Sequence, residues 1–375
     1  MDPAQHDAEA LACLRLALAP GVSPRLAARA VARAGSAVAA LQRPLRWWRG
    51  LAGVRSAEVV EHPSRADPEP VLRRLQDLQA HALTPGHSQW PAALRAGLHD
   101  PPAAVFVRGC LPPPSQRRVA LVGTRAASAY GLRVARELGE ALARRGVCVV
   151  SGLALGIDAA AHAGALAAGM TGCATVAVLG SGLACCYPPE NSGLAEAVAR
   201  GGGLLSEFPP DMGPERWHFP RRNRLVAALA EVVVVVEAPL RSGALLTAQE
   251  ALDQGREVLA VPGPVGRPSH EGAHALLRQQ AAGVCTGLDD VLCALGMVRP
   301  AAEAARSGLV LPEPMAPAAG PGRILWNLLD PDEPRDADWL CLESALPVAE
   351  VAEALAALEL SGRARRLPGV GYVRT

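Results

Sequence analysis

Residues 232–236 are five consecutive valines, and this run constrains the fold more than any other feature of the chain. An uninterrupted β-branched run has no polar face to present to water, so it predicts a central strand of a parallel sheet that is covered on both faces. Directly before it stands HFPRRNRL, in which Arg221, Arg222 and Arg224 surround Asn223. Three cations beside a buried segment require anionic partners, either in a ligand or in the protein.

Similar short apolar runs recur between residues 118 and 263, and each ends in glycine, serine or an acid. They are RVALVG, VCVVSG, ATVAVLGSG, LLSE, EVVVVVEA and EVLAVPG. Helical segments of about 10–15 residues separate them, which is the rhythm of βαβ units. The sequence therefore predicts an α/β fold with an extended, Rossmann-like, doubly wound and mostly parallel sheet.

The remaining sequence predicts further domains around this core. Residues 1–65 contain short Ala/Leu-rich helices, broken where Pro20-Gly21 precedes Ser23-Pro24, a typical helix stop and N-cap. Residues 299–321 are rich in proline and alanine, as linkers are. The last stretch reads as helix, short helix, longer helix and hairpin, the layout of a winged helix. We expect a helical domain of the helix-hairpin-helix or SAM-like type at 1–65 and a core at 66–298 that includes a lead-in with a helix near 69–81. A linker at 299–321 and a winged helix at 322–375 are expected to follow.

Composition excludes several classes of function. All 37 basic residues are arginines, so the chain has neither the lysine of a GxxxxGK[ST] phosphate loop nor that of a pyridoxal Schiff base. It contains no GxSxG elbow, no GxGxxG after the first core strand, and no metal-ligand spacing among its nine cysteines. The N-terminus lacks a basic n-region, and no apolar run approaches the ~18 residues that span a bilayer. We expect a cytoplasmic protein with reduced, buried thiols, no cofactor, no metal and no membrane association.

The carboxyl ends of the predicted strands carry small and polar residues. Parallel sheets of this type bind ligands beyond those ends, where helix N-termini and backbone N–H groups approach an anion. This pattern indicates a phosphate-bearing ligand. The candidate positions include Gly123, Thr124, Arg125, Ser151, Gly152, Gly180, Glu207, Glu237, Arg241, Ser242 and Gly243.

The arginine cluster is expected at the N-terminal start of a helix, where the helix dipole disfavours cations. Phosphate groups in the neighbouring crevice would offset that penalty. Phe219 and Trp217 are candidates for stacking on nucleobases. Both can equally be packing residues, and packing is the interpretation we favour for Trp217. If the arginines instead pair with an acid such as Glu207 or Glu237, they hold the fold together.

Asp158 and His162 lie four residues apart and therefore on one face of a helix. A catalytic pair needs a nucleophile or a third ligand, and the sequence assigns neither. We expect His162 to bond to Asp158 and the pair to order the Ser151 loop.

Taken together, these segments resemble the DNA-processing protein A family (DprA, also called Smf). The resemblance rests on motifs in order between residues 118 and 292: VALVGTRAASAYG, VVSGLALGIDAAAHAGAL, AVLGSGLACCYPPEN, LLSEFPP, FPRRNRLVAAL, RSGALLTAQEALDQGREVLAVPG and HALLRQQAAGV. The flanking segments are similar to the family's N-terminal helical module and its C-terminal winged helix.

The resemblance implies a cytoplasmic, non-enzymatic protein that binds incoming single-stranded DNA during natural transformation, protects it and loads the RecA recombinase onto it. It also implies a homodimer. Carried over by motif, the DNA and phosphate site comprises Gly123, Thr124, Arg125, Ser151, Gly152, Gly180, Phe219, Arg221, Arg222, Asn223, Arg224, Ser242 and Gly243. Two positions depart from the family pattern: Leu155 replaces an arginine that contacts DNA, and Gly272-Ala273-His274 replaces GTN.

Two other functions stay open from the sequence. One is a nucleoside-monophosphate phosphoribohydrolase of the same superfamily, although residues 241–250 lack the glycine pair of that family's PGGxGTxxE loop and keep only Glu250 near the acid's place. The other is a DNA-binding regulator that acts through the winged helix alone. We expect the acidic helix 347–362 of that domain to make protein contacts, because a helix that enters a DNA groove is usually basic.

Overall fold

The valine run forms strand β7 (Val232–Glu237), every residue of which is buried in our computed structural model of the chain. The structure describes residues 3–52, 58, 60–96, 98–298, 317, 320–330, 334–367 and 371–374. It divides into two units, Met1–Arg299 and Pro300–Thr375. The predicted linker lies almost entirely outside the described residues, and the predicted domain boundaries stay predictions. In the described part of the chain, no helix has the length and apolarity needed to cross a membrane.

A nine-stranded sheet forms the centre of the first unit, in the order β1-β2-β6-β5-β4-β3-β7-β8-β9. β1 pairs antiparallel with β2 and β2 with β6, and all other pairs are parallel. The strands other than β7 are β1 (Ala80–Leu83), β2 (Val105–Gly109), β3 (Arg118–Gly123), β4 (Cys148–Ser151), β5 (Thr175–Val178), β6 (Gly202–Ser206), β8 (Glu257–Ala260) and β9 (Gly283–Val284). The six runs expected as strands are β3 to β8, so the predicted parallel sheet is confirmed.

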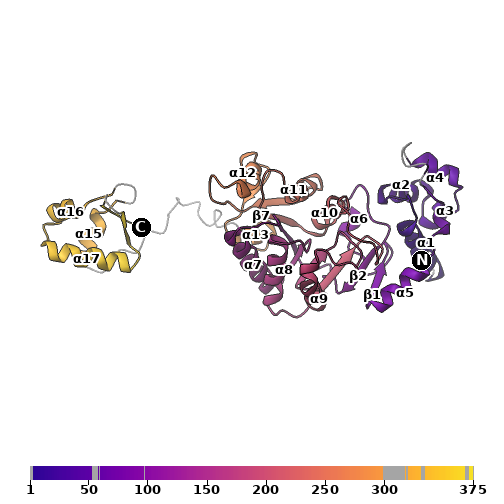
Figure 1. Cartoon of the computed structure of the whole chain (residues 1–375), viewed down its shortest axis with the longest axis horizontal. Helices are drawn as coiled ribbons and strands as arrows, with labels where there is room; N and C mark the ends of the chain where they lie inside the picture. The colour runs from indigo at the N-terminus through magenta and orange to yellow at the C-terminus, as the bar shows by residue number, and fades with distance from the viewer. Residues whose placement is uncertain are drawn as a thin grey trace. The chain divides into compact units, whose positions relative to one another are not determined.

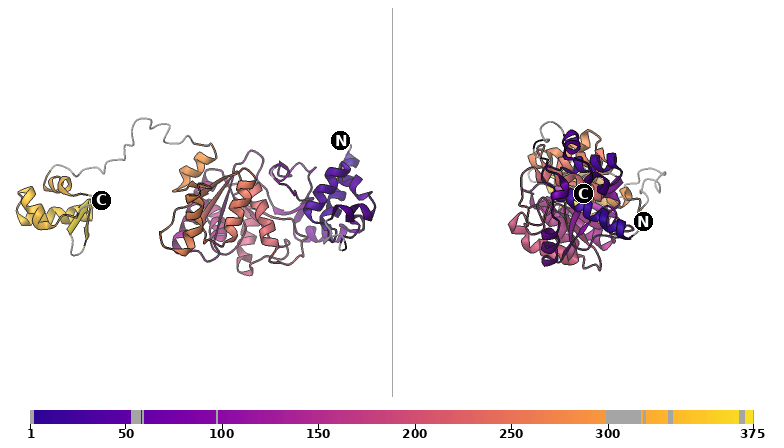
Figure 2. Two further views of the ribbon diagram at one scale, coloured as in Figure 1. Left: turned by 90° about the horizontal axis from the view of Figure 1, so that it is seen from above. Right: turned by 90° about the vertical axis from the view of Figure 1, so that its right-hand side faces the viewer.

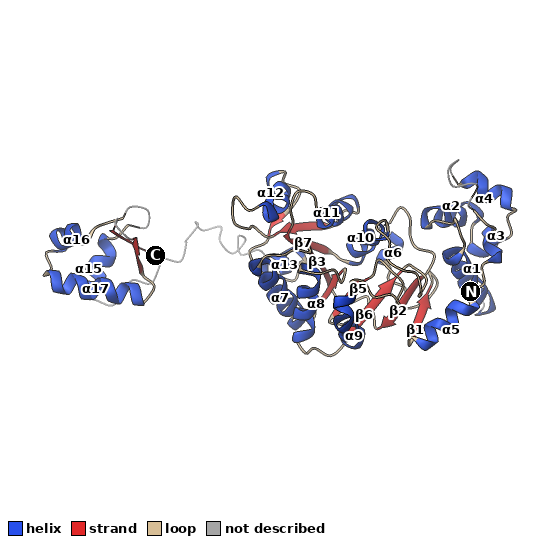
Figure 3. Ribbon diagram, viewed as in Figure 1, coloured by secondary structure: helices blue, strands red, loops and turns tan. Residues whose placement is uncertain are grey.

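Helices cover both faces of this sheet (Figures 1 and 3). Alternate residues of each strand face opposite sides, so the valines of β7 divide between two hydrophobic cores. One core lies under α10 (His218–Leu229), α11 (Gly243–Asp253) and α12 (Glu271–Arg278). The opposite face packs under α7 (Ala129–Arg144), α8 (Ile157–Ala167) and α13 (Leu288–Ala294), with α9 (Ser192–Gly201) further along it. Figure 2 shows the same layers from above.

The strand order fixes where a ligand site belongs. From β3 the chain winds through β4, β5 and β6 on one side, and then returns to β3's other side through β7, β8 and β9. The order therefore reverses between β3 and β7. In open α/β sheets the crevice beyond the carboxyl ends of strands at such a reversal is the usual ligand site.

Two short elements of the lead-in differ from the sequence prediction. The helix expected near 69–81 is α5 (Glu69–Asp77), which ends four residues earlier, and β1 begins at Ala80. β1 and β2 extend the parallel sheet with an antiparallel edge that the sequence prediction lacked. Both strands are only four or five residues long, and their pairing depends on β6, about 100 residues further along the chain.

The N-terminal part of the first unit is helical, as expected. Its helices share a small core of their own, and Ser23 caps α2 by accepting a hydrogen bond from Leu26 N at 3.2 Å. α2 carries proline at its first position and ends at Gly35, whose φ of 93° is left-handed. These helices are α1 (Pro3–Leu18), α2 (Pro24–Ala34), α3 (Ala37–Leu41) and α4 (Leu45–Leu51).

The second unit has the order expected of a winged helix. Three helices pack around one apolar cluster, and a hairpin follows the third. The elements are α15 (Pro321–Leu328), α16 (Ala337–Ser344), α17 (Val348–Leu360), β10 (Ala364–Leu367) and β11 (Gly371–Arg374).

The thiols are in part as expected. All nine cysteines are free, and Cys13, Cys148, Cys173 and Cys285 are buried. Cys110, which directly follows β2, is exposed, and the other four cysteines are only partly buried, so the expectation of buried thiols is wrong for these five.

Candidate functional site

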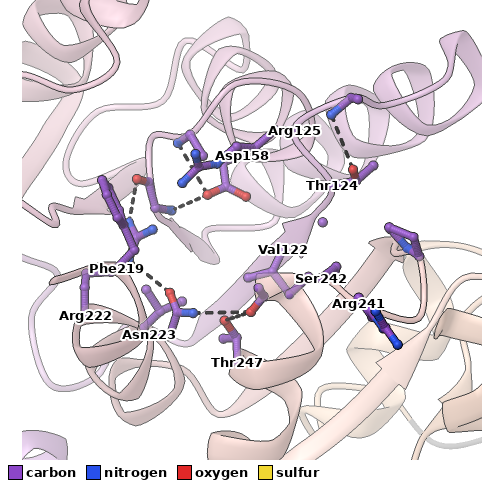
Figure 4. Close-up of a pocket in the computed structure, with 18 residues that line it drawn as sticks. Val122, Thr124, Arg125, Asp158, Phe219, Arg222, Asn223, Arg241, Ser242 and Thr247 are labelled. Carbon is purple, nitrogen blue, oxygen red and sulfur yellow. Dashed lines mark hydrogen bonds between the residues drawn. The ribbon is translucent and has the colours of Figure 1, made fainter. Parts of the chain in front are cut away.

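A pocket of about 350 Å³ lies at the carboxyl ends of the strands, where the strand order reverses. Figure 4 shows its lining, which comes from the ends of β3, β4 and β7 and from helices α8, α10 and α11. Nine of the thirteen predicted binding residues line it: Gly123, Thr124, Arg125, Gly152, Phe219, Arg222, Asn223, Ser242 and Gly243. The other four, Ser151, Gly180, Arg221 and Arg224, do not.

Arg221 and Arg224 pair with a carboxylate of the protein. Glu207 follows β6, and its side chain is only 2% exposed. It accepts a hydrogen bond from Arg221 Nε at 3.0 Å through one oxygen and pairs with Arg224 Nη2 through the other. Asp100 approaches Arg224 Nε at 3.5 Å. The expectation that these two arginines line the phosphate site is therefore not supported by their geometry, and the structure places them in an ion-pair cluster that anchors α10.

Arg222 is a buried residue in the floor of the pocket. Its Nη1 donates to the carbonyl oxygens of Gly152 and Val178, and its Nε donates to Asn223 Oδ1 at 3.2 Å. Burial lowers the pKa of Arg222, and the nearby Asp158 carboxylate opposes that shift. With its donors directed at protein acceptors, Arg222 joins β4, β5 and α10.

The helix position expected for the arginines was also wrong. α10 begins at His218, so Arg221, Arg222 and Arg224 stand at its fourth, fifth and seventh positions. The dipole penalty falls off within the first turn, and carboxylates or carbonyls already compensate these charges.

The Ser151 loop is ordered by Asp158 without help from His162. Asp158 Oδ2 accepts hydrogen bonds from Gly152 N at 3.1 Å and from Ala154 N at 3.4 Å. Burial raises the pKa of Asp158, and Arg222 and these two amides oppose the rise. The Ser151 hydroxyl donates to Leu121 O at 2.6 Å, and Ser151 does not line the pocket.

His162 does not bond to Asp158, contrary to expectation. Its Nδ1 lies 2.7 Å from Thr175 Oγ1, and that hydroxyl donates onward to Val149 O at 2.6 Å. Burial and the charge of Arg222 lower the pKa of His162 to about 3. A neutral imidazole engaged with β5 supports packing of α8, and the expected His162–Asp158 pair does not exist.

Three helix N-termini point toward the reversal of strand order, and acids of the protein occupy two of them. Glu237 accepts from Ser128 N at 3.0 Å and from Ser128 Oγ at 2.8 Å, at the start of α7. Asp158 lies in the first turn of α8. Near a helix N-terminus such carboxylates compensate the partial positive charge and exclude a further anion.

The third N-terminus, that of α11, is open. Its N-cap residue Ser242 makes no capping hydrogen bond, and its hydroxyl has no partner in the described part of the chain. The carbonyl of Gly243 is fixed by Asn223 Nδ2 at 3.2 Å and Thr247 Oγ1 at 3.3 Å. A helix N-terminus with free N–H groups and a nearby hydroxyl suits a phosphate oxygen.

Two exposed arginines flank this N-terminus. Arg125 follows β3, and its guanidinium lies 5.2 Å from the centre of the Phe219 ring. Arg241 directly precedes Ser242 and makes no ion pair among the described residues. In the sequence Arg241 is a strand-end candidate but is not among the thirteen predicted site residues; its adjacency to the N-cap serine of α11 is the signal that could have included it.

Phe219 provides a flat apolar surface at the edge of the pocket. Its ring lies over Gly180, where a Cβ atom would stand 2.8 Å from Phe219 Cδ1. Gly180 thus acts through Phe219, since it leaves room for the ring. Tyr187, which the sequence prediction missed, lies beside the same ring with centroids 5.5 Å apart and is 39% exposed.

The two departures from the family pattern lie outside the pocket lining. Leu155 is 40% exposed, and no cation takes its place in the loop after β4. His274 is partly buried, and its Nε2 lies 3.0 Å from Gly263 O. The cations that line the pocket are therefore Arg125, Arg241 and the internally bonded Arg222.

The fold is that of a Rossmann-like α/β protein with a winged helix, and its candidate ligand site lies where the strand order reverses. Comparison with known proteins makes the class specific. The family model for DNA recombination-mediator protein A matches residues 81–296, and the model for the DprA winged helix domain matches residues 311–370. The chain belongs to the DNA-processing protein A (DprA/Smf) family.

Individual relatives agree with this assignment. Protein Smf of Escherichia coli is 41% identical over 296 residues, which cover 78% of this chain and 77% of that protein. The X-ray structure of DprA from Streptococcus pneumoniae superposes with a TM-score of 0.64 at 30% identity, covering 76% of this chain and 97% of that one. A structure of Helicobacter pylori DprA, which describes the single-stranded DNA binding mode of that protein, superposes with a TM-score of 0.51 at 28% identity over 58% of this chain and 95% of that one.

Proposed function

We propose that this chain binds single-stranded DNA at the pocket between β3 and β7. A backbone phosphate sits at the N-terminus of α11, held by its N–H groups, by Ser242 and by the guanidinium groups of Arg125 and Arg241. A neighbouring base stacks on Phe219. The observation that carries the proposal is the open N-terminus of α11, since the starts of α7 and α8 already hold acids of the protein.

The biological setting follows from family membership. We propose that the protein acts in the cytoplasm as a homodimer, protects incoming DNA during natural transformation and loads RecA onto it. No step of this role requires bond cleavage. The proposal for single-stranded DNA is consistent with the binding mode described for the Helicobacter pylori relative.

The first test compares forms of DNA. A stacking platform and a narrow anion site require unpaired bases, so a single strand is expected to bind more tightly than a duplex of equal length, by roughly tenfold or more. Competition in fluorescence anisotropy at moderate salt measures this ratio. A duplex that displaces a labelled single strand as efficiently as an unlabelled single strand does would contradict the single-strand proposal.

An enzymatic alternative makes a different prediction. A phosphoribohydrolase would place an acid beside the ribose, but Glu250 does not line the pocket, and the amides of Gly152 and Ala154 engage Asp158. We therefore expect no adenine release when the purified protein is incubated with AMP. Chromatographic detection of free adenine, abolished by Asp158→Asn, would favour the enzyme instead.

The winged helix is proposed to contact protein or to regulate the core. The exposed side of α17 presents Glu350, Glu353 and Glu359, and among its own residues there is no cation. A fragment of residues 318–375 is expected to bind duplex DNA far more weakly than the full chain binds a single strand. Removal of the same residues should leave single-strand binding in place. Tight binding of duplex DNA by the fragment would contradict the proposal that the winged helix contacts protein or regulates the core.

A further inference from the structure

The N-terminal helices carry a concentration of positive charge that the core pocket does not explain. Residues 10–57 contain eight arginines and no acid, although the chain as a whole has a formal charge of only +1. In the described part of this stretch, six of the arginines are exposed and none makes an ion pair: Arg25, Arg29, Arg33, Arg43, Arg46 and Arg49. We call these six the N-terminal arginine surface.

Three of these arginines form a row on α2. Arg25, Arg29 and Arg33 are spaced four residues apart, so they share one face of the helix. The opposite face, with Leu26, Ala27 and Ala30, is buried in the N-terminal core. Successive arginines are separated by about 6 Å of helix rise, far enough to reach separate phosphate groups.

Helix α4, which packs in the same N-terminal core, supplies further arginines of this surface. Arg46 and Arg49 are exposed, whereas Trp48 and Leu51 are buried beside the apolar face of α2. Arg43, just before α4, lies 5.8 Å from the centre of the Trp47 ring. The cations therefore stand on packed helices and not on a loose tail.

The acid that directly precedes this stretch is already engaged elsewhere. Glu9 accepts hydrogen bonds from Ala37 N at 2.5 Å and from Val38 N at 3.1 Å, and so caps α3. Like charges at this helical spacing repel one another. An external polyanion would remove that repulsion.

The partner that fits is a nucleic-acid duplex. A membrane surface requires large apolar side chains beside the cations, and Leu11 is the one large apolar residue exposed among residues 3–52. Single strands need aromatic platforms for their bases, but Trp48 is buried and Trp47 is partly buried beside Arg43. A duplex hides its bases and presents regularly spaced phosphates, which arginine forks bind without reading sequence.

We propose that the N-terminal arginine surface binds the phosphate backbone of duplex DNA. This second surface is separate from the core pocket proposed for single strands, and its function does not depend on that pocket. The protein would thereby engage a duplex and a single strand at different places on one chain.

The test uses the full-length chain with Arg25, Arg29 and Arg33 replaced by glutamine, which preserves helix propensity. The probe is a mixed-sequence duplex of about 20 base pairs, titrated at about 50 and about 200 mM salt. We expect duplex affinity at low salt to fall roughly tenfold or more and the salt slope of log K to decrease by about 2–3, since each duplex phosphate contact contributes ~0.9. The affinity for a short single strand and the melting temperature should both stay unchanged.

Matched variants keep the result interpretable. Glutamine at Arg133, Arg136 and Arg144, three exposed arginines on α7, removes the same charge and should change duplex affinity less than twofold. If the α2 variant melts early, glutamine at Arg43, Arg46 and Arg49 provides an independent variant with the same expected loss. Unchanged duplex affinity and slope in both variants would overturn the proposal, as would equally tight, arginine-dependent binding of polyglutamate or anionic vesicles. Failure of the core-pocket proposal would be seen in a different measurement, as single-strand binding that stays unchanged when Arg125 and Arg241 are replaced.

Discussion

Replacing Arg125 and Arg241 together by alanine is expected to weaken single-stranded DNA binding by at least about 100-fold, since hydrogen bonds to charged groups contribute about 1.5–3 kcal/mol each. The salt slope of log K should fall by about 1.4, because each phosphate contact on a single strand contributes ~0.7. Both side chains are exposed and make no ion pair among the described residues, so the melting temperature should hold. Titration of a labelled oligonucleotide at several salt concentrations measures affinity and slope together.

The control for this variant is a pair of exposed arginines away from the pocket. Alanine at Arg133 and Arg136 on α7 removes the same charge and should leave the slope within experimental error. If the pocket variant kept full affinity and slope, no phosphate would lie at the α11 N-terminus. The single-strand site would then have to be sought on another surface.

Glu207→Ala is expected to cause the largest loss of stability. The Glu207 side chain is 2% exposed and pairs with both Arg221 and Arg224, and the Arg224 side chain is itself only 6% exposed. Removing the carboxylate leaves buried guanidinium charge without its main partner, which typically costs about 3–5 kcal/mol. Chemical denaturation of the full chain, followed by the loss of helix signal, measures the change in the free energy of unfolding.

Glu196→Ala provides a matched comparison. Glu196 pairs with Arg108 through both oxygens, but its side chain is 50% exposed, so its loss should cost at most ~1 kcal/mol. Equal effects of the two substitutions would show that the Glu207 cluster does not anchor α10. Arg221 and Arg224 would then again be candidates for binding a ligand.

The parallel core could be predicted because its signal is local. Five buried valines in β7, and similar runs in its neighbours, have no alternative to burial between helices, and the glycine turns mark their ends. β1 and β2 could not be found in this way. Their pairing depends on a partner strand far along the chain, and neither run is long enough to show a period.

The partners of the arginine cluster could not be predicted from the sequence. HFPRRNRL indicates that cations lie beside the sheet, and this is correct. It does not indicate that Glu207, fourteen residues before Arg221, pairs with two of these arginines. Nor does it indicate that the carbonyl oxygens of Gly152 and Val178 accept hydrogen bonds from the third. Partners of a charged side chain are set by tertiary packing, so the sequence left both interpretations open, and the structure favours the one in which these arginines hold the fold.

The sequence could not show which of three helix starts is open to an anion. Each of α7, α8 and α11 follows a strand and a glycine- or serine-containing turn, so the sequence treats them alike. Glu237 fills the first of these starts from β7, a different element, and Asp158 fills the second from within α8 itself. Elimination of these two leaves α11, with Ser242 at its cap.

Photo-crosslinking tests this assignment most directly. A short oligothymidylate with one 4-thiothymidine is irradiated with the full-length protein, and the crosslinked peptides are identified by mass spectrometry. We expect crosslinks at Phe219 and within residues 122–126 and 239–247, all lost in the variant that lacks Arg125 and Arg241. Crosslinks confined to the N-terminal helices or to the winged helix, with the pocket peptides unmodified, would contradict it.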